Sequence, residues 1–183
     1  MARGRRKPKG KKINPTFFIF CEGQTEEAYI NVLKAEYRLP SIIIHSKVKG
    51  LDISARFIKE YKKNKPSDPK DRTFLFYDLD TPGIYSRLVQ IDGCKLLISN
   101  PSVELWFLLH YKNQTASINS DRCCKELEKE NKEYKKGTID TKLRKKLIDN
   151  IKIAIERAKS LPNSNNPSST VYQFLEILNG LES

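Results

Sequence analysis

The hydrophobic pattern near the start of the chain predicts a strand followed by a helix. Residues 17–20 are four consecutive apolar residues, as expected of a short buried strand. Residues 25–38 then place apolar side chains at helical spacing, and Pro40 ends the predicted helix. Glu22 therefore follows the carboxyl end of a strand, and ligands of open α/β sheets bind at that edge. A glutamate at that edge can bind a cation or transfer a proton. The competing interpretation is that Glu22 is a solvated loop residue with no function.

The same alternation of strand and helix patterns continues along the chain. Apolar runs at 42–48, 73–77 and 95–99 predict three more strands, and the stripes at 53–61 and 84–90 predict helices between them. These runs are too continuously apolar for a sheet with one solvated face. The pattern therefore predicts an α/β protein with a four-stranded parallel sheet covered by helices on both faces.

Acidic residues follow two of the predicted strands. Asp78 and Asp80 come directly after the strand at 73–77, and Glu22 follows the first strand. The carboxyl ends of parallel strands lie at one edge of a sheet, so we expect these three carboxylates to converge. Two aspartates two positions apart on an extended segment point to the same side. Carboxylate oxygens are the ligands that Mg²⁺ prefers, and such a set suits phosphodiester chemistry.

A strongly apolar helix is predicted after the fourth strand. Asn100 is expected as its N-cap and Pro101 as its first residue, and 102–111 is apolar nearly all round, which predicts burial. Glu104 is the one acid in it. A buried carboxylate needs a partner or a metal, so Glu104 either supports the metal site or serves the helix as a cap or dipole partner. For His110 we expect a half-buried imidazole with satisfied hydrogen bonds.

The last third of the chain is charged and predicted to be helical. A lysine- and glutamate-rich helix is expected over 121–134. Apolar residues every four positions over 139–158 predict one amphipathic helix. A loop is expected over 162–167, and Ser168 or Ser169 is expected to cap a final helix.

Length and composition fit one domain with an appendage. The 183 residues, 38% of them hydrophobic, divide into a basic tail at 1–14, an α/β core at 15–112 and a helical extension at 113–183. No run of 18 apolar residues predicts a membrane span, and no apolar segment follows the basic start as in a secretory signal. The four cysteines lack zinc spacing, so we interpret them as reduced thiols of a cytoplasmic protein.

Positive charge is concentrated at the start of the chain. Residues 1–12 carry seven Lys and Arg and no acid, which leaves +5 of the net +12 for the rest. We expect this tail to be disordered and either to hold a polyanion or only to aid solubility. The candidate nucleic-acid contacts are Arg3, Arg5, Arg6 and Lys7 in the tail, and Lys47 and Lys49 beside the second strand.

Two resemblances cover most of the chain after the tail. Glu22-Gly23 after one strand, with Asp78-Leu79-Asp80 after a later one, looks like the Toprim catalytic domain of topoisomerases, primases and OLD-type nucleases. More closely, the chain resembles the RloB-like proteins. The segments that carry this resemblance are CEGQTEEAYI from Cys21, YDLDT from Tyr77, SNPSVELWFLLHY from Ser99, Tyr134-Lys135-Lys136-Gly137, AIERAKSL from Ala154 and NPSSTVYQFLEIL from Asn166.

The resemblance implies a Toprim-like, Mg²⁺-dependent nuclease, with Mn²⁺ as the alternative ion, acting on RNA or DNA. Glu22 or Glu26 would be the general acid/base, and Asp78 and Asp80 would hold the metal with Glu22. Glu104 is the fourth expected catalytic carboxylate. The residues expected to support the site are Glu26, Asn100 and His110.

The resemblance also implies a setting. RloB-like proteins are paired with an ATPase encoded nearby, and similar pairs act in anti-phage abortive infection. The expected partners are therefore nucleic acid, that ATPase and further copies of the chain in a homo-oligomer, with no membrane. The alternative is a non-catalytic module whose Toprim-like sheet binds nucleic acid or the ATPase.

Overall fold

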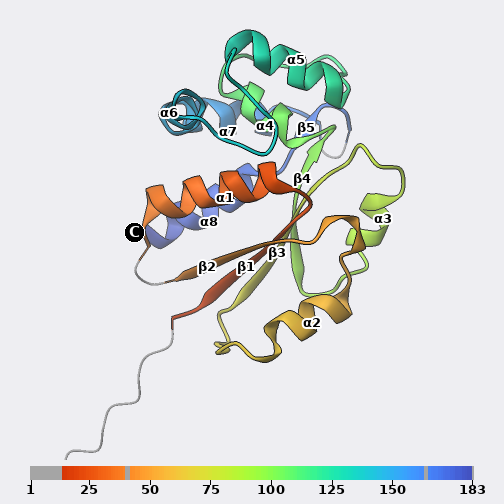
Figure 1. The fold of residues 1–183 in the computed structure, drawn as a ribbon, viewed down its shortest axis with the longest axis vertical. Helices are drawn as coiled ribbons and strands as arrows, with labels where there is room; N and C mark the ends of the chain where they lie inside the picture. Colours follow the sequence, from red (N-terminus) through yellow and green to blue (C-terminus); the bar gives the residue numbers. More distant parts are fainter. Residues whose placement is uncertain (1–13, 40–41, 163–164, 183) are drawn as a thin grey trace, which may run out of the picture.

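The protein is an α/β protein built on one five-stranded, mostly parallel sheet. The computed structural model describes residues 14–39, 42–162 and 165–182, so the predicted basic tail lies outside the described residues except for Asn14. The strand order is β2-β1-β3-β4-β5. The strands are β1 (Thr16–Cys21), β2 (Ile43–Val48), β3 (Arg72–Asp78), β4 (Cys94–Asn100) and β5 (Ser168–Ser169) (Figure 1).

The first four strands are parallel to one another, as predicted, and the fifth was not expected. β1 pairs with β2 and β3, β3 pairs with β4, and every one of these pairings is parallel. β5 comes from the predicted extension and pairs antiparallel with β4, so the extension is not purely helical.

Helices cover both faces of the sheet, which confirms the layered arrangement (Figure 1). α1 and α8 pack on one face, and α2 and α3 pack on the other. The described helices are α1 (Gln24–Tyr37), the 3₁₀ turn η1 (Gly50–Asp52), α2 (Ala55–Lys63), α3 (Ile84–Leu88), α4 (Val103–Leu109), α5 (Ser120–Glu130), α6 (Thr141–Asp149), α7 (Ile151–Lys159) and α8 (Tyr172–Glu182).

Alternation along the central strands divides the core into two clusters. Phe17, Ile19 and Cys21 of β1 belong to the larger cluster, which also contains side chains of α1 and α4 through α8. Phe18 and Phe20 point the other way and pack against α2 and α3. All five side chains are buried, and this two-sided burial explains why the strands read as continuous apolar runs.

The prediction of one helix over 139–158 is wrong. The structure has α6 and α7 instead, with Asn150 between them at φ −107° and ψ 16°. A spacing of four residues turns by about 40° per step around a helix of 3.6 residues per turn, so a long straight helix cannot keep the stripe on one side. The break comes at Asn150, whose Nδ2 donates to the His110 carbonyl at 2.7 Å.

Two predicted caps are also wrong. Ser168 and Ser169 do not cap the last helix, because they form β5 opposite Asn100 and Ser99 of β4. Asn100 is not the N-cap of α4, because β4 continues through it; Ser102 takes that place. Pairing with β5 thus extends β4, a tertiary contact that local sequence preferences do not report.

A search of the described helices finds none that is both long and apolar enough to cross a membrane.

Candidate active site

The predicted carboxylates meet at the carboxyl ends of β1 and β3. Glu22 follows β1, its backbone N–H donates to the Phe76 carbonyl of β3 at 3.0 Å, and its carboxylate faces the end of that strand. There Glu22 Oε2 accepts a hydrogen bond from the backbone N–H of Asp78 at 3.0 Å. The parallel β1–β3 register therefore brings the two acids into direct contact at one edge of the sheet.

Asp78 links this edge to α4. Its Oδ1 accepts a hydrogen bond from the backbone N–H of Val103, the first residue of α4, at 2.8 Å. The next residue, Leu79, donates its N–H to the carbonyls of Ser99 and Pro101 at 2.9 and 3.2 Å. Asp78 is buried, and these contacts fix the start of α4 beside it.

Glu104 lies in the first turn of α4 and is fully buried. Its two carboxylate oxygens accept hydrogen bonds from the Ser102 hydroxyl at 2.6 Å and from the Tyr134 hydroxyl at 2.7 Å. These two bonds satisfy the carboxylate from within the protein. Its charge still reaches Asp78, where it helps to raise the pKa of that group. Glu104 therefore lies on the same edge as Asp78 but does not touch its carboxylate through any described hydrogen bond.

Asp80 is the exposed member of the set. Its Oδ2 accepts a hydrogen bond from the hydroxyl of Ser120, the first residue of α5, at 2.9 Å. Its charge raises the pKa of Glu22 and that of Asp78. The extension thus contacts the acidic edge at Asp80 as well as at Glu104.

Glu26 has a structural contact at the start of α1. Its Oε2 accepts the backbone N–H of Gly23, the N-cap of that helix, at 2.9 Å. The side chain is buried, and burial together with the charges of Glu22 and Glu104 raises the pKa of Glu26 to about 7. Glu26 is thus a carboxyl group near the edge that changes protonation around neutral pH.

The acids raise one another's pKa. Burial raises the pKa of Asp78 well above its ordinary value, and the charges of Glu26, Glu104, Glu22 and Asp80 raise it further. Burial also raises the pKa of Glu22, despite the hydrogen bond from the Asp78 N–H. Such a cluster costs free energy in its ionised form unless a positive charge accompanies it.

A cleft of about 330 Å³ opens at this edge, and a segment far along the chain forms part of its wall. Lys136 and Gly137 line it together with Glu22, Glu26 and Asp78. Our sequence prediction gave Lys136 and Gly137 no function. The available signal was the segment Tyr134-Lys135-Lys136-Gly137, which carries part of the family resemblance but no strand or helix pattern.

The donor chemistry of the cleft fits Mg²⁺, although no ready-made cage is present. No group of three or more His, Cys, Asp or Glu side chains in the described ranges is arranged to hold a metal ion. Mg²⁺ usually keeps several waters and takes only one or two protein carboxylates. Asp78 and Glu22 each commit one oxygen to a backbone N–H, and the second oxygen of each has no hydrogen bond within the described residues.

The other predicted site residues lie in three different places. Asn100 ends β4 at the acidic edge. Lys47 and Lys49 lie at the carboxyl end of β2, where the Lys49 N–H donates to the Cys21 carbonyl at 3.0 Å. His110 lies at the far end of α4, and its Nδ1 contacts the Trp106 carbonyl at 2.9 Å.

His110 is fully buried rather than half-buried, so that expectation is wrong. Nε2 of the ring has no hydrogen-bond partner among the described residues. Burial lowers the pKa of His110 to about 4, so the ring is neutral at neutral pH. Its edge-to-face contact with Trp106, with ring centroids 4.7 Å apart, makes it a core residue.

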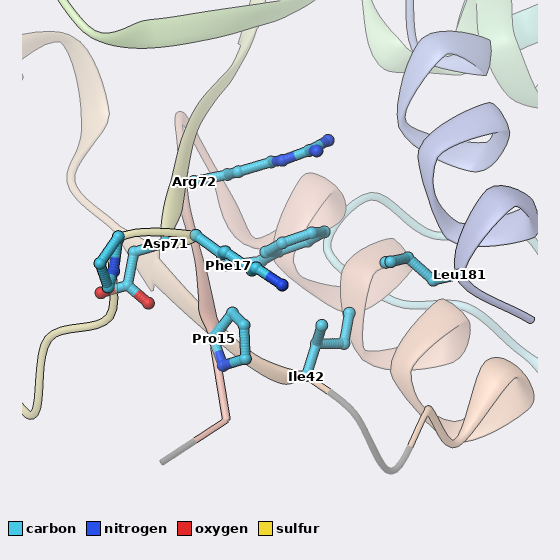
Figure 2. Close-up of a pocket in the computed structure, with 8 residues that line it drawn as sticks. Pro15, Phe17, Ile42, Asp71, Arg72 and Leu181 are labelled. Carbon is cyan, nitrogen blue, oxygen red and sulfur yellow. The ribbon is translucent and has the colours of Figure 1, made fainter. Parts of the chain in front are cut away.

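A second cleft, of about 490 Å³, lies at the opposite ends of the strands (Figure 2). Arg72 lies over the Phe17 ring there, with its guanidinium carbon 5.6 Å from the ring centroid. The Asp71 carboxylate accepts the backbone N–H groups of Thr16 and Asp68 at 2.6 and 3.1 Å. Asp71 is the one acid among the described residues that line this second cleft, and its carboxylate is already bound to two backbone N–H groups. Among these residues the second cleft therefore lacks the carboxylate cluster found at the first.

The fold and the acidic edge define an α/β protein with a cluster of carboxylates at the carboxyl ends of its parallel strands. A family model described as RloB-like protein matches residues 17–178. The chain therefore belongs to the RloB-like family. Neither the curated proteins nor the solved structures contain a significant match to it.

Proposed function

We propose that this RloB-like protein is a Toprim-like, Mg²⁺-dependent nuclease that hydrolyses phosphodiester bonds of RNA or DNA. The observation that carries the proposal is the contact between Glu22 and Asp78, which joins the ends of two strands into one acidic cleft. Phosphodiester hydrolysis needs charge compensation at the phosphate and a group that moves a proton.

Asp78 would hold the metal through the oxygen that its contact with the backbone does not use, and Asp80 would join it, while Glu22 would keep its second oxygen for proton transfer. Asp80 is exposed and, among the described residues, bonds only to the hydroxyl groups of Ser120 and Thr81, so its carboxylate can turn toward the cleft. A bound Mg²⁺ would act as a Lewis acid that offsets the charge of the phosphate. The raised pKa values of Asp78 and Glu22 support this assignment, because a cation relieves the repulsion among the acids.

Glu22 is our choice for the group that moves the proton. Its carboxylate is only partly buried and lines the cleft, whereas Glu26 is buried and caps α1. Its raised pKa brings it closer to neutrality, where a general acid/base is most effective. Glu104 would act only through its charge, which raises the pKa of Asp78, because both of its carboxylate oxygens are hydrogen-bonded within the protein.

The biological setting that we propose follows the family resemblance. The nuclease would act in anti-phage abortive infection and would be released for cutting by a partner ATPase. Membership of the RloB-like family supports this setting. Copurification of the chain with an ATPase encoded beside it, and protection of cells only when both are present, would be the direct test.

One observation favours a second candidate, a non-catalytic module. Asp78 and Glu104 both make hydrogen bonds that stabilise the protein itself, which acids of a scaffold would also do. Thermal unfolding with and without Mg²⁺ separates the two. Metal at about 100 times its dissociation constant should stabilise a true site by about 2.7 kcal/mol. No shift in wild type, together with no effect of Asp78→Asn on nucleic-acid cleavage, would favour the module.

A further inference from the structure

The segment between α5 and α6, residues 131–140, reaches the acidic cleft, and we call it the α5–α6 loop. It passes over the start of α1 (Figure 1). Lys136 of this loop lines the cleft. We propose that Lys136 is a substrate-positioning residue whose ammonium group binds a phosphate of the nucleic acid and opposes metal binding in the absence of substrate. This inference rests on the proposed function and adds a residue to it.

Two hydrogen bonds hold the α5–α6 loop against the site, one on each side of Lys136. The Tyr134 hydroxyl donates to Glu104 in the buried interior at 2.7 Å. The Gly137 backbone N–H donates to the Thr25 hydroxyl of α1 at 2.8 Å. Neither bond uses the Lys136 side chain, so the loop keeps its place when that side chain is changed.

Gly137 has a backbone conformation that residues with a side chain adopt only with strain. Its φ is +83°, a left-handed conformation that favours glycine. A Cβ atom on it would lie 3.3 Å from Oε1 of Gln24. The backbone thus approaches α1 closely enough for the preceding residue, Lys136, to reach the cleft wall.

The negative charge of the acids in the cleft explains why a lysine is suited to position 136. Among the residues that line the cleft, Lys136 is the cation beside three acids, Glu22, Glu26 and Asp78. Within the described ranges its Nζ takes part in none of the ion pairs found. The charge of Glu104, with those of Asp78 and Asp80, raises the pKa of Lys136, so it remains protonated. An ammonium without a direct carboxylate partner is available to an incoming phosphate.

The same charge predicts opposite effects on the two ligands. A phosphate gains a charge-assisted hydrogen bond from Lys136, whereas a divalent cation is repelled by it. Removing the charge should therefore weaken nucleic-acid binding and strengthen Mg²⁺ binding. A residue that only supports the fold would weaken both, so the signs distinguish the two roles.

The test uses the full chain and three variants, Lys136→Met, Lys136→Arg and the control Lys135→Met. Lys135 is exposed on the same loop and does not line the cleft. Binding of a fluorescein-labelled single-stranded oligonucleotide is measured by anisotropy in EDTA, where no cutting takes place. Mg²⁺ binding is measured separately, without nucleic acid, by calorimetry.

We expect Lys136→Met to raise the oligonucleotide dissociation constant about tenfold and to reduce the slope of log affinity against log salt by about 0.7. We expect the Mg²⁺ dissociation constant to fall by about twofold to fivefold. Lys136→Arg should keep wild-type affinities, and Lys135→Met should change neither. Equal effects at Lys135 and Lys136, or weaker Mg²⁺ binding in Lys136→Met, would overturn the inference. These measurements need no cleavage, so a wild-type protein that fails to cut would count against the proposed function alone.

Discussion

The carboxylate of Glu22 accepts a hydrogen bond from the backbone N–H of Asp78, 56 residues away in the chain, at 3.0 Å. This bond joins the end of β1 to the end of β3. Through its own carboxylate, Asp78 then holds the first N–H of α4 at 2.8 Å. Three segments of the chain are therefore tied together at the acidic cleft, and changes to its side chains should separate metal binding from stability.

Asp80→Ala should abolish Mg²⁺-dependent cutting while leaving the fold nearly as stable as wild type. The side chain is exposed and bonds only to hydroxyl groups among the described residues, so its removal costs less than about 1 kcal/mol of unfolding free energy. Cleavage of labelled RNA and DNA, with urea unfolding of both proteins, checks this. Asp92→Ala is the matched control, an exposed aspartate beside the start of β4. Equal activity in Asp80→Ala and Asp92→Ala would remove Asp80 from the site.

Glu104→Gln and Tyr134→Phe separate the charge of Glu104 from its hydrogen bonds. Each change disturbs the buried Tyr134–Glu104 bond and should cost about 1 to 2 kcal/mol of unfolding free energy. Only Glu104→Gln removes the negative charge behind Asp78, so only this variant should bind Mg²⁺ more weakly. Calorimetric Mg²⁺ titration of the two proteins gives the comparison. Unchanged Mg²⁺ affinity in Glu104→Gln would leave Glu104 with a purely structural role.

Glu26 should make the protein less stable as the pH rises toward neutrality. Its pKa is about 7 in the folded protein against 4.5 for the ordinary group, so between these values the folded state binds more protons than the unfolded state. The linkage relation then gives a stabilising contribution that is full below pH 4.5, declines between pH 4.5 and 7 and is lost above 7. The decline in unfolding free energy is on the order of 2 to 3 kcal/mol.

The comparison of Glu26→Gln with wild type isolates this effect, because glutamine does not titrate. The difference in unfolding free energy between the two proteins should change in favour of Glu26→Gln as the pH is raised from 5 to 8. Urea unfolding at a series of pH values measures it. A difference that stays constant with pH would show that Glu26 titrates at its ordinary value.

Much of this arrangement follows from local sequence signals, and the remainder depends on contacts between distant segments. Continuous apolar runs identified the four parallel strands, and acids placed directly after two of them predicted that Glu22 and Asp78 meet at one edge of the sheet. β5 has only two residues and exists because β4 offers it a partner, so no local pattern identifies it. The break at Asn150 likewise depends on a bond to the His110 carbonyl.

Lys136 was missed as a site residue for a related reason. It lies in a loop without hydrophobic periodicity, and only the bonds of Tyr134 to Glu104 and Gly137 to Thr25 bring it to the cleft. His110 shows the opposite error. Histidine often takes part in catalysis, so His110 was predicted to support the site. The seven residues of α4 instead place it away from the cleft, in the core.

Deletion of residues 1–12 should weaken nonspecific nucleic-acid binding and flatten its dependence on salt. These residues carry seven positive charges, and removing one phosphate contact lowers the slope of log affinity against log salt by about 0.7 to 0.9. Anisotropy titrations at several salt concentrations measure the slope. A slope equal to that of the full chain would place the phosphate contacts on the folded part, where Lys47 and Lys49 lie at the carboxyl end of β2.

Cleavage of labelled RNA and DNA by wild type and by Asp78→Asn tests the central claim most directly. Asparagine keeps an oxygen that accepts the Val103 N–H, so the link to α4 is retained while the charge is removed. We predict that wild type cuts with Mg²⁺ or Mn²⁺ and not in EDTA, and that Asp78→Asn, with a similar melting temperature, loses about 100-fold or more of the activity. Cutting that persists in EDTA, or an Asp78→Asn variant as active as wild type, would contradict the account.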